Sequence, residues 1–326
     1  MDGAVHPPGQ AAIGSPGELT QDFHLPSSQD TRRDLLRRSF LLPAASILAA
    51  QVSPAQAPGP SARTQQHLAQ LKPDIPPDVL VAHSISYRLA TRKDADWRRL
   101  DIYRQRDRGK LPVLIFFHGG AWRSGHRRQY IHLGVSLALG GIAAVIPSYS
   151  QAPTYPFPEP VKDAASVIAW VHENIAPLGG DPNKVFVGGH SSGAQIASLV
   201  SLDARYLQFH YMSPSILRGV VSLSGIYKIG AGFEYAFGSN PELWEQASPL
   251  NFVQKGAPPF LVLSGSRDAR IVTEHTGPFV QKLKAAGVAV TEKVYDGEDH
   301  SSMIAFASRR DSELQMQIRS FVKEHT

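Results

Sequence analysis

The chain has 326 residues, of which 42% are hydrophobic and 19% charged, a balance typical of a globular protein with room for one sizeable domain. The formal net charge is +5, but no long Lys/Arg run or zinc-ligand spacing accompanies it, so we expect no nucleic-acid partner. The sequence has no cysteine, which excludes disulfides, cysteine-ligated metals and a cysteine nucleophile, and no apolar run reaches the length of a membrane span.

The N-terminal segment, residues 1–57, has the pattern of an export signal behind a disordered tail. Residues 1–31 are rich in Gly, Pro, Ser and Gln, and Arg37-Arg38-Ser39-Phe40-Leu41 resembles the twin-arginine motif. A short apolar stretch at 40–52 follows, and Ala55-Gln56-Ala57 fits a signal-peptidase site. The alternative is a short amphipathic helix in a disordered tail. We expect an exported protein, periplasmic or extracellular.

Residues 58–77 contain five prolines and are predicted to be a linker or wrapping arm before a folded domain at 78–326. In that domain, short apolar runs alternate with helical patterns, which predicts a mostly parallel sheet with helices on both faces. The first two strands are expected to form a partly exposed antiparallel pair. The predicted strands are 79–87, 99–103, 113–117, 143–146, 184–187, 220–223, 260–263 and 290–295, and the predicted helices are 129–139, 161–174, 193–202, 276–286 and 312–324.

Ligand sites in such sheets lie just past the carboxyl ends of the strands. Past the strand at 184–187 comes Gly189-His190-Ser191-Ser192-Gly193, a G-x-S-x-G sequence between a strand and a helix. Its two glycines permit a tight turn that exposes the Ser191 hydroxyl at a helix N-terminus. We therefore predict Ser191 as a nucleophile. Ser192 is the rival serine, and we assign it only a backbone N–H donor role.

The segment past the strand at 113–117 is His118-Gly119-Gly120-Ala121-Trp122. Acyl transfer generates an oxyanion, which needs backbone N–H donors aimed at it. We predict that the N–H groups of Gly120, Ala121 and Ser192 form this oxyanion hole. The alternative is an ordinary strand-to-loop turn with a core tryptophan.

Two further strand ends supply an acid and a base. Asp268 follows the strand at 260–263, and His300 follows the strand at 290–295. We predict Asp268 as the acid that orients His300, the general base. Glu298 and Asp299 are rival carboxylates, but they are close to His300 in sequence. Residues so close in sequence seldom reach the geometry that the acid needs. The chain order Ser, Asp, His is that of α/β-hydrolases.

With these motifs the chain resembles the esterase/lipase group of α/β-hydrolases over roughly residues 95–310, including carboxylesterases, feruloyl and acetylxylan esterases, prenylcysteine methylesterases and arylformamidases. Ser148-Tyr149, the prolines at 156, 158 and 160, and residues 179–185 also look like family landmarks. Ala121 stands where the hormone-sensitive-lipase type usually has a third glycine, and the short N-terminal segment leaves little room for a cap domain. The polyester hydrolases share a G-H-S-x-G turn but lack the His-Gly-Gly loop.

The resemblance implies a serine esterase that needs no metal or organic cofactor and acts on a small-molecule ester, including aryl esters. An arylformamidase-like amidase and a non-catalytic binding protein on the same fold are the alternatives. Trp122 and Tyr149 are the predicted substrate-binding residues. Arg123, Arg127 and Arg128 follow the oxyanion loop, where they fit either recognition of an anionic group or a solvated helix start.

Overall fold

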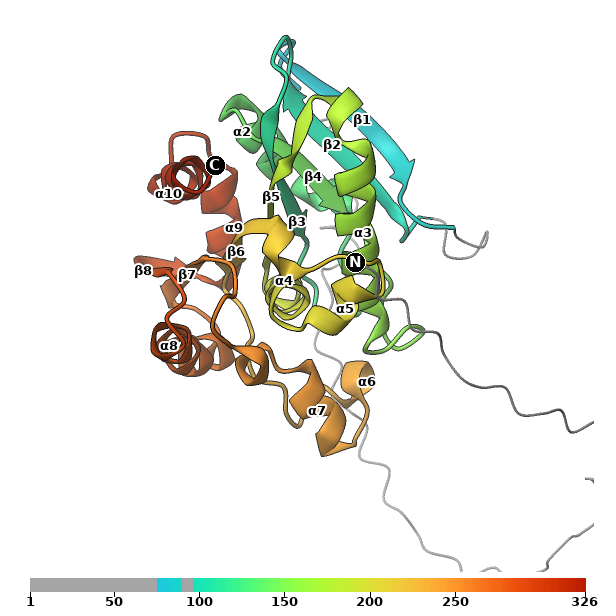
Figure 1. The fold of residues 1–326 in the computed structure, drawn as a ribbon. Helices are drawn as coiled ribbons and strands as arrows, with labels where there is room; N and C mark the ends of the chain where they lie inside the picture. Colours follow the sequence, from blue (N-terminus) through green and yellow to red (C-terminus); the bar gives the residue numbers. More distant parts are fainter. Residues whose placement is uncertain (1–74, 90–95) are drawn as a thin grey trace, which may run out of the picture. The chain divides into compact units, whose positions relative to one another are not determined.

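The computed structural model describes residues 75–89 and 96–326. At the centre of these residues lies one eight-stranded sheet. Within these residues, the strands lie in the order β1-β2-β4-β3-β5-β6-β7-β8 (Figure 1). The β1–β2 and β2–β4 pairs are antiparallel and every other pair is parallel, which confirms the predicted sheet. The strands are β1 (Val79–Ser86), β2 (Arg99–Gln105), β3 (Leu111–Phe117), β4 (Ala143–Pro147), β5 (Gly180–His190), β6 (Leu217–Leu223), β7 (Phe260–Arg267) and β8 (Val290–Asp299).

The α-helices in the same residues cover both faces of the sheet. They are α2 (Ile131–Leu139), α3 (Glu159–Asn174), α4 (Ser192–Leu202), α5 (Ala204–Gln208), α6 (Glu234–Phe237), α7 (Pro241–Ala247), α8 (Arg270–Ala285), α9 (His300–Ser308) and α10 (Glu313–Glu324). Buried side chains of α3, α4 and α8 pack in one apolar cluster, and those of α2, α9 and α10 pack in another. None of these helices is both long and apolar enough to cross a bilayer.

The strand β3 shows why the buried apolar runs form the centre of the sheet. Successive side chains of a strand point to opposite faces. Val113, Ile115 and Phe117 accordingly join the α3–α4–α8 cluster, whereas Leu114 and Phe116 join the other. A strand that is covered on both faces must therefore be apolar at every position, and the predicted run at 113–117 is confirmed by this packing.

Several elements extend beyond the predicted limits. The strand β5 begins at Gly180 instead of 184, and β8 continues to Asp299 because its backbone pairs with β7 as far as Arg267. The added residues of both strands are mostly polar. They are held in the sheet by backbone hydrogen bonds, so no apolar pattern in the sequence marks them as strand. The helix α9 and the short helices α6 and α7 were not predicted. The predicted export segment at 1–57, and residues 58–74 of the predicted linker at 58–77, lie outside the described residues.

Candidate active site

Ser191 lies at the turn between β5 and α4, with φ 57° and ψ −119°, a conformation that a residue with a side chain rarely adopts. The two glycines around it are required by close backbone packing. A Cβ on Gly189 would lie 2.3 Å from the Gly193 carbonyl carbon, and a Cβ on Gly193 would lie 2.2 Å from the Phe117 carbonyl oxygen. The sequence thus folds into a strained turn that holds Ser191 at the end of β5.

The three predicted members of the triad meet at the carboxyl edge of the sheet. His300, the first residue of α9, donates from Nδ1 to Asp268 Oδ1 at 2.7 Å. Its Nε2 lies 2.8 Å from Ser191 Oγ. Because a carboxylate only accepts hydrogen bonds, the ring proton of neutral His300 belongs on Nδ1, and Nε2 accepts from the Ser191 hydroxyl. This is the geometry in which an imidazole can take the proton of a nucleophilic serine.

Asp268 is fixed by groups besides His300. Ser224, which follows β6, donates from Oγ to Oδ2 at 2.5 Å, and the Ala269 N–H donates to Oδ1 at 2.8 Å. Burial would raise the pKa of the Asp268 carboxyl, but the hydrogen bonds from His300 and Ser224 outweigh it and lower the pKa below its usual value. Asp268 is therefore ionised at neutral pH. The sequence analysis missed Ser224, although its place at a strand end was a usable signal.

The rival residues lie in other contacts. The Asp299 side chain accepts the N–H groups of Ser301 and Ser302 at 2.9 Å and 2.8 Å, so it caps the N-terminus of α9. His300 bonds to Asp268 and not to Glu298. Ser192 is buried, and its hydroxyl lies 3.4 Å from the Tyr149 hydroxyl instead of near His300.

The loop after β3 packs directly against Ser191. A Cβ on Gly119 would lie 3.2 Å from the His190 carbonyl oxygen and 3.3 Å from the Ser191 Cβ, so the loop passes close to the turn that holds Ser191. Gly120 has φ 135° and Ala121 has φ 51°, and the Gly120 carbonyl accepts the N–H groups of Arg123 and Ser124. Within the described part of the chain, the N–H groups of Gly120 and Ala121 have no acceptor. Together with the first N–H of α4, at Ser192, they form a set of donors suited to an oxyanion.

The structure places Trp122 and Tyr149 differently from the prediction that they bind substrate. Trp122 is 1% exposed, donates from Nε1 to Gln195 at 2.9 Å, and packs its ring against Phe233 and Phe237. Tyr149 is fully buried and donates its hydroxyl proton to the His118 carbonyl at 2.9 Å. Neither ring is exposed, so neither can contact a ligand in this structure. Trp122 ends the loop after β3, and Tyr149 bonds to His118 at its start.

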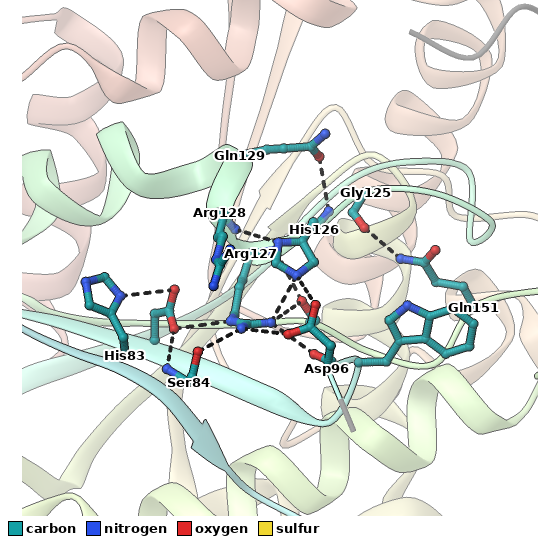
Figure 2. A network of polar contacts seen from close by, with 12 residues as sticks. His83, Ser84, Asp96, Gly125, His126, Arg127, Arg128, Gln129 and Gln151 are labelled. Carbon is teal, nitrogen blue, oxygen red and sulfur yellow. Dashed lines mark hydrogen bonds and ion pairs between the residues drawn. The ribbon is translucent and has the colours of Figure 1, made fainter. Parts of the chain in front are cut away.

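Arg127 is also buried, so it is withdrawn from any contact with substrate, whereas Arg123 and Arg128 are exposed. Figure 2 shows the network that surrounds its guanidinium. Arg127 donates to Asp101 at 3.2 Å, to Asp96 at 2.9 Å and to Ser84 at 3.1 Å. These bonds tie the 3-10 turn at Arg127–Tyr130, after the oxyanion loop, to the edge strand β1 and its neighbour β2.

Within the described ranges, no group of three histidine, aspartate or glutamate side chains is placed to hold a metal ion. The site brings together a serine, an imidazole, a carboxylate and a loop of free N–H groups. This set can perform nucleophilic acyl transfer.

Comparisons with known proteins show what this chain is similar to. Residues 100–283 match the family designated BD-FAE. Esterase LipQ of Mycobacterium tuberculosis is 33% identical over 213 residues, which cover 59% of this chain and 50% of LipQ. The isoprenylcysteine alpha-carbonyl methylesterase ICME of Arabidopsis thaliana is 29% identical, over 64% of this chain and 55% of its own. The chain thus spans about half the length of these curated relatives.

Solved structures give the same fold. A thermostable esterase from Pseudomonas putida has a TM-score of 0.64 at 24% identity, over 80% of this chain and 87% of its own. Esterase B from Lactobacillus rhamnosis has a TM-score of 0.66 at 20% identity, over 81% of this chain and 91% of its own. At these identities the likeness establishes the α/β-hydrolase fold alone.

Proposed function

The chain belongs to the BD-FAE family of α/β-hydrolases, and on that premise we propose that it is a carboxylic ester hydrolase with an acyl-enzyme intermediate on Ser191. One observation carries the proposal: the continuous hydrogen-bonded path from Ser191 through His300 to Asp268. The curated relatives named as esterases support the ester as the bond that is cleaved.

The mechanism follows from the positions of the protons. His300 Nε2 takes the Ser191 proton as Oγ attacks the ester carbonyl, and ionised Asp268 stabilises the imidazolium that forms. The proton then passes from Nε2 to the departing alcohol, which leaves an acyl group on Ser191. Water attacks the acyl-enzyme in a second half-reaction, with His300 again as the base.

The oxyanion of each tetrahedral intermediate is proposed to lie on the N–H groups of Gly120, Ala121 and Ser192. The free state of the two loop N–H groups supports this role. The Tyr235 hydroxyl also donates to the Ala121 carbonyl at 3.1 Å. This bond fixes the loop at Ala121. Donors fixed before the reaction need no reorganisation when charge develops.

We propose small or aryl esters as the substrates. Two partly buried aromatic residues contact the oxyanion loop: Phe233 packs against the Trp122 ring, and Tyr235 bonds to the Ala121 carbonyl. They give that side of the site an aromatic character. Aromatic surfaces favour planar apolar groups.

A substrate panel tests the proposal. We would measure kcat/KM on short p-nitrophenyl esters, a feruloyl ester, acetylated xylan and N-formylkynurenine, for the wild type and Ser191→Ala. The proposal expects the aryl or short esters to give the highest kcat/KM and Ser191→Ala to lose at least about a thousandfold. A preference for N-formylkynurenine would indicate an amidase instead, and an active Ser191→Ala protein would contradict the mechanism.

We also propose export by the twin-arginine route, supported by the order of the arginine pair, apolar stretch and cleavage motif in residues 37–57. A bacterial host that expresses the full chain should deliver a shortened protein to the periplasm. Replacing Arg37 and Arg38 by lysine should leave the uncleaved protein in the cytoplasm. Equal periplasmic yields from both chains would contradict the proposal.

A further inference from the structure

A second histidine lies against the proposed base. His190 immediately precedes Ser191, and its ring centre lies 4.8 Å from that of His300, at 37° between the planes. The side chain is 6% exposed. The mechanism above uses no atom of this ring, so the contact needs another explanation.

The hydrogen bonds of His190 determine where its proton lies. Its Nε2 is 2.9 Å from the His300 carbonyl oxygen, and a carbonyl only accepts, so Nε2 carries the hydrogen. Its Nδ1 is 3.2 Å from the Tyr130 hydroxyl. Burial, with the His300 imidazole close by, lowers the pKa of His190 to about 3. The ring is therefore neutral at pH 7, and bare Nδ1 accepts the Tyr130 proton.

Tyr130 extends this path to the oxyanion loop. The Gly119 N–H donates to the Tyr130 hydroxyl at 2.8 Å, which leaves the Tyr130 proton free for His190. Each group in the path thus donates in one direction, from Gly119 to Tyr130, from Tyr130 to His190, and from His190 to the His300 carbonyl. The path connects the loop that would hold the oxyanion with the backbone of the base.

The position of His300 explains why it needs such an anchor. It follows β8, which is an edge strand of the sheet, and its side chain remains 31% exposed. Asp268 fixes the ring from one side only. A small displacement of the base, on the order of 1 Å, can reduce a rate about a hundredfold.

We propose that His190 and Tyr130 are positioning residues, which hold His300 in register with the oxyanion loop through the neutral Nε2–H form of His190. This inference rests on the proposed role of His300 as the base. It assigns no proton transfer to His190 or Tyr130.

The tautomer of His190 can be observed directly. The imidazole ¹⁵N resonances of the wild-type protein at pH 7 should show a protonated Nε2 and a bare Nδ1 for His190. A protonated Nδ1, or a doubly protonated ring, would overturn the proposal. This measurement does not depend on whether Ser191 is the nucleophile, so it separates the inference from the proposed function.

Kinetics then test the positioning role. His190→Gln can keep a donor for the His300 carbonyl, whereas His190→Met fills similar space without one. We expect His190→Met to lower kcat about tenfold to a hundredfold with KM within about twofold, and His190→Gln to recover much of that loss. Equal losses in the two variants, or losses that appear in KM instead of kcat, would overturn the proposal.

Tyr130→Phe removes the middle of the path and has a matched control. Tyr103 is another buried tyrosine, and its hydroxyl has no hydrogen-bond partner among the described residues. Tyr130→Phe should lower kcat by about threefold to tenfold, measured below its Tm, which should also fall because the buried Gly119 N–H loses its acceptor. Tyr103→Phe should change neither kcat nor Tm. Equal kcat in the two variants would overturn the role of Tyr130. Ser191→Ala is measured in parallel. If it is inactive while Tyr130→Phe and Tyr103→Phe have equal kcat, the positioning role of Tyr130 fails and the proposed function stands.

Discussion

Asp268 is the residue on which the orientation of the proposed base depends. It has a buried carboxylate, and it stays ionised only because His300, Ser224 and the Ala269 N–H all donate to it. Hydrogen bonds to a charged acceptor contribute more than neutral ones. Ser224 is therefore expected to matter for both stability and the charge of the site, although it touches no reacting atom.

Ser224→Ala should lower the free energy of unfolding by about 1.5–3 kcal/mol at pH 7. A carboxyl whose pKa is lowered by folding stabilises the folded state above its unfolded pKa, and this contribution is lost as the pH falls through the folded pKa. The difference between variant and wild type should therefore shrink below about pH 4. Urea unfolding at several pH values measures it.

Ser222→Ala is the control for that series. Its hydroxyl is also buried, but it pairs with the neutral Tyr227 hydroxyl at 2.6 Å. The cost of losing this bond should not change between pH 7 and pH 4. A Ser224→Ala penalty that is equally independent of pH would contradict the role of Ser224 in stabilising ionised Asp268.

At the scale of elements, the turn between β5 and α4 depends on backbone packing that admits no side chain. Gly193→Ala places a Cβ against the Phe117 carbonyl. We expect a loss of at least about 2 kcal/mol of unfolding free energy and at least tenfold of kcat, because Ser191 must move. Gly230→Ala is the control, since its Cβ meets nothing within 4 Å. Full activity in Gly193→Ala would contradict the described turn.

The Arg127 network joins the 3-10 turn after the oxyanion loop to the edge strand β1 and its neighbour β2 (Figure 2). Arg127→Met removes the guanidinium that pairs with the buried Asp101 carboxylate. We expect a loss of about 3–5 kcal/mol in chemical denaturation. Arg128→Met, at the exposed neighbouring position, should change stability by less than about 0.5 kcal/mol. Equal effects of the two substitutions would argue against the network.

At the scale of the whole molecule, two buried histidines should make the fold sensitive to acid. Burial lowers the pKa of both His118 and His190 to about 3, against about 6.5 in an unfolded chain. Between these values the unfolded chain binds protons that the folded chain does not. The free energy of unfolding should therefore fall as the pH decreases from 6.5, by about 1.4 kcal/mol per pH unit for each histidine.

Urea unfolding between pH 7 and pH 5 measures this slope. His118→Asn can keep a donor near the position of His118 Nδ1, which bonds to the Gly119 carbonyl at 2.8 Å, and should flatten the slope by about one proton. NMR titration of the wild type gives a second measurement, in which neither histidine should titrate above about pH 4. Titration of either ring near pH 6.5 would contradict the prediction.

The sequence could predict the central strands and the turn around Ser191 because burial on both faces and close backbone packing leave a local pattern. It could not predict α9, whose start depends on capping by Asp299, or the full length of β5 and β8, which backbone pairing sets. Ser224 and Tyr130 were missed for a different reason. Each acts on a residue distant in the chain. The place of Ser224 after β6 marks it as a strand-end residue, but neither Ser224 nor Tyr130 carries a motif that reveals its partner.

The central claim is that Ser191 is the nucleophile, and covalent labelling tests it most directly. The protein would be treated with a fluorophosphonate, and the modified residue identified by peptide mass spectrometry, with Ser191→Ala and Ser192→Ala treated in parallel. The geometry predicts one adduct, on Ser191, that persists in Ser192→Ala and disappears in Ser191→Ala. An adduct on Ser192, or none on the folded wild-type protein, would contradict the account.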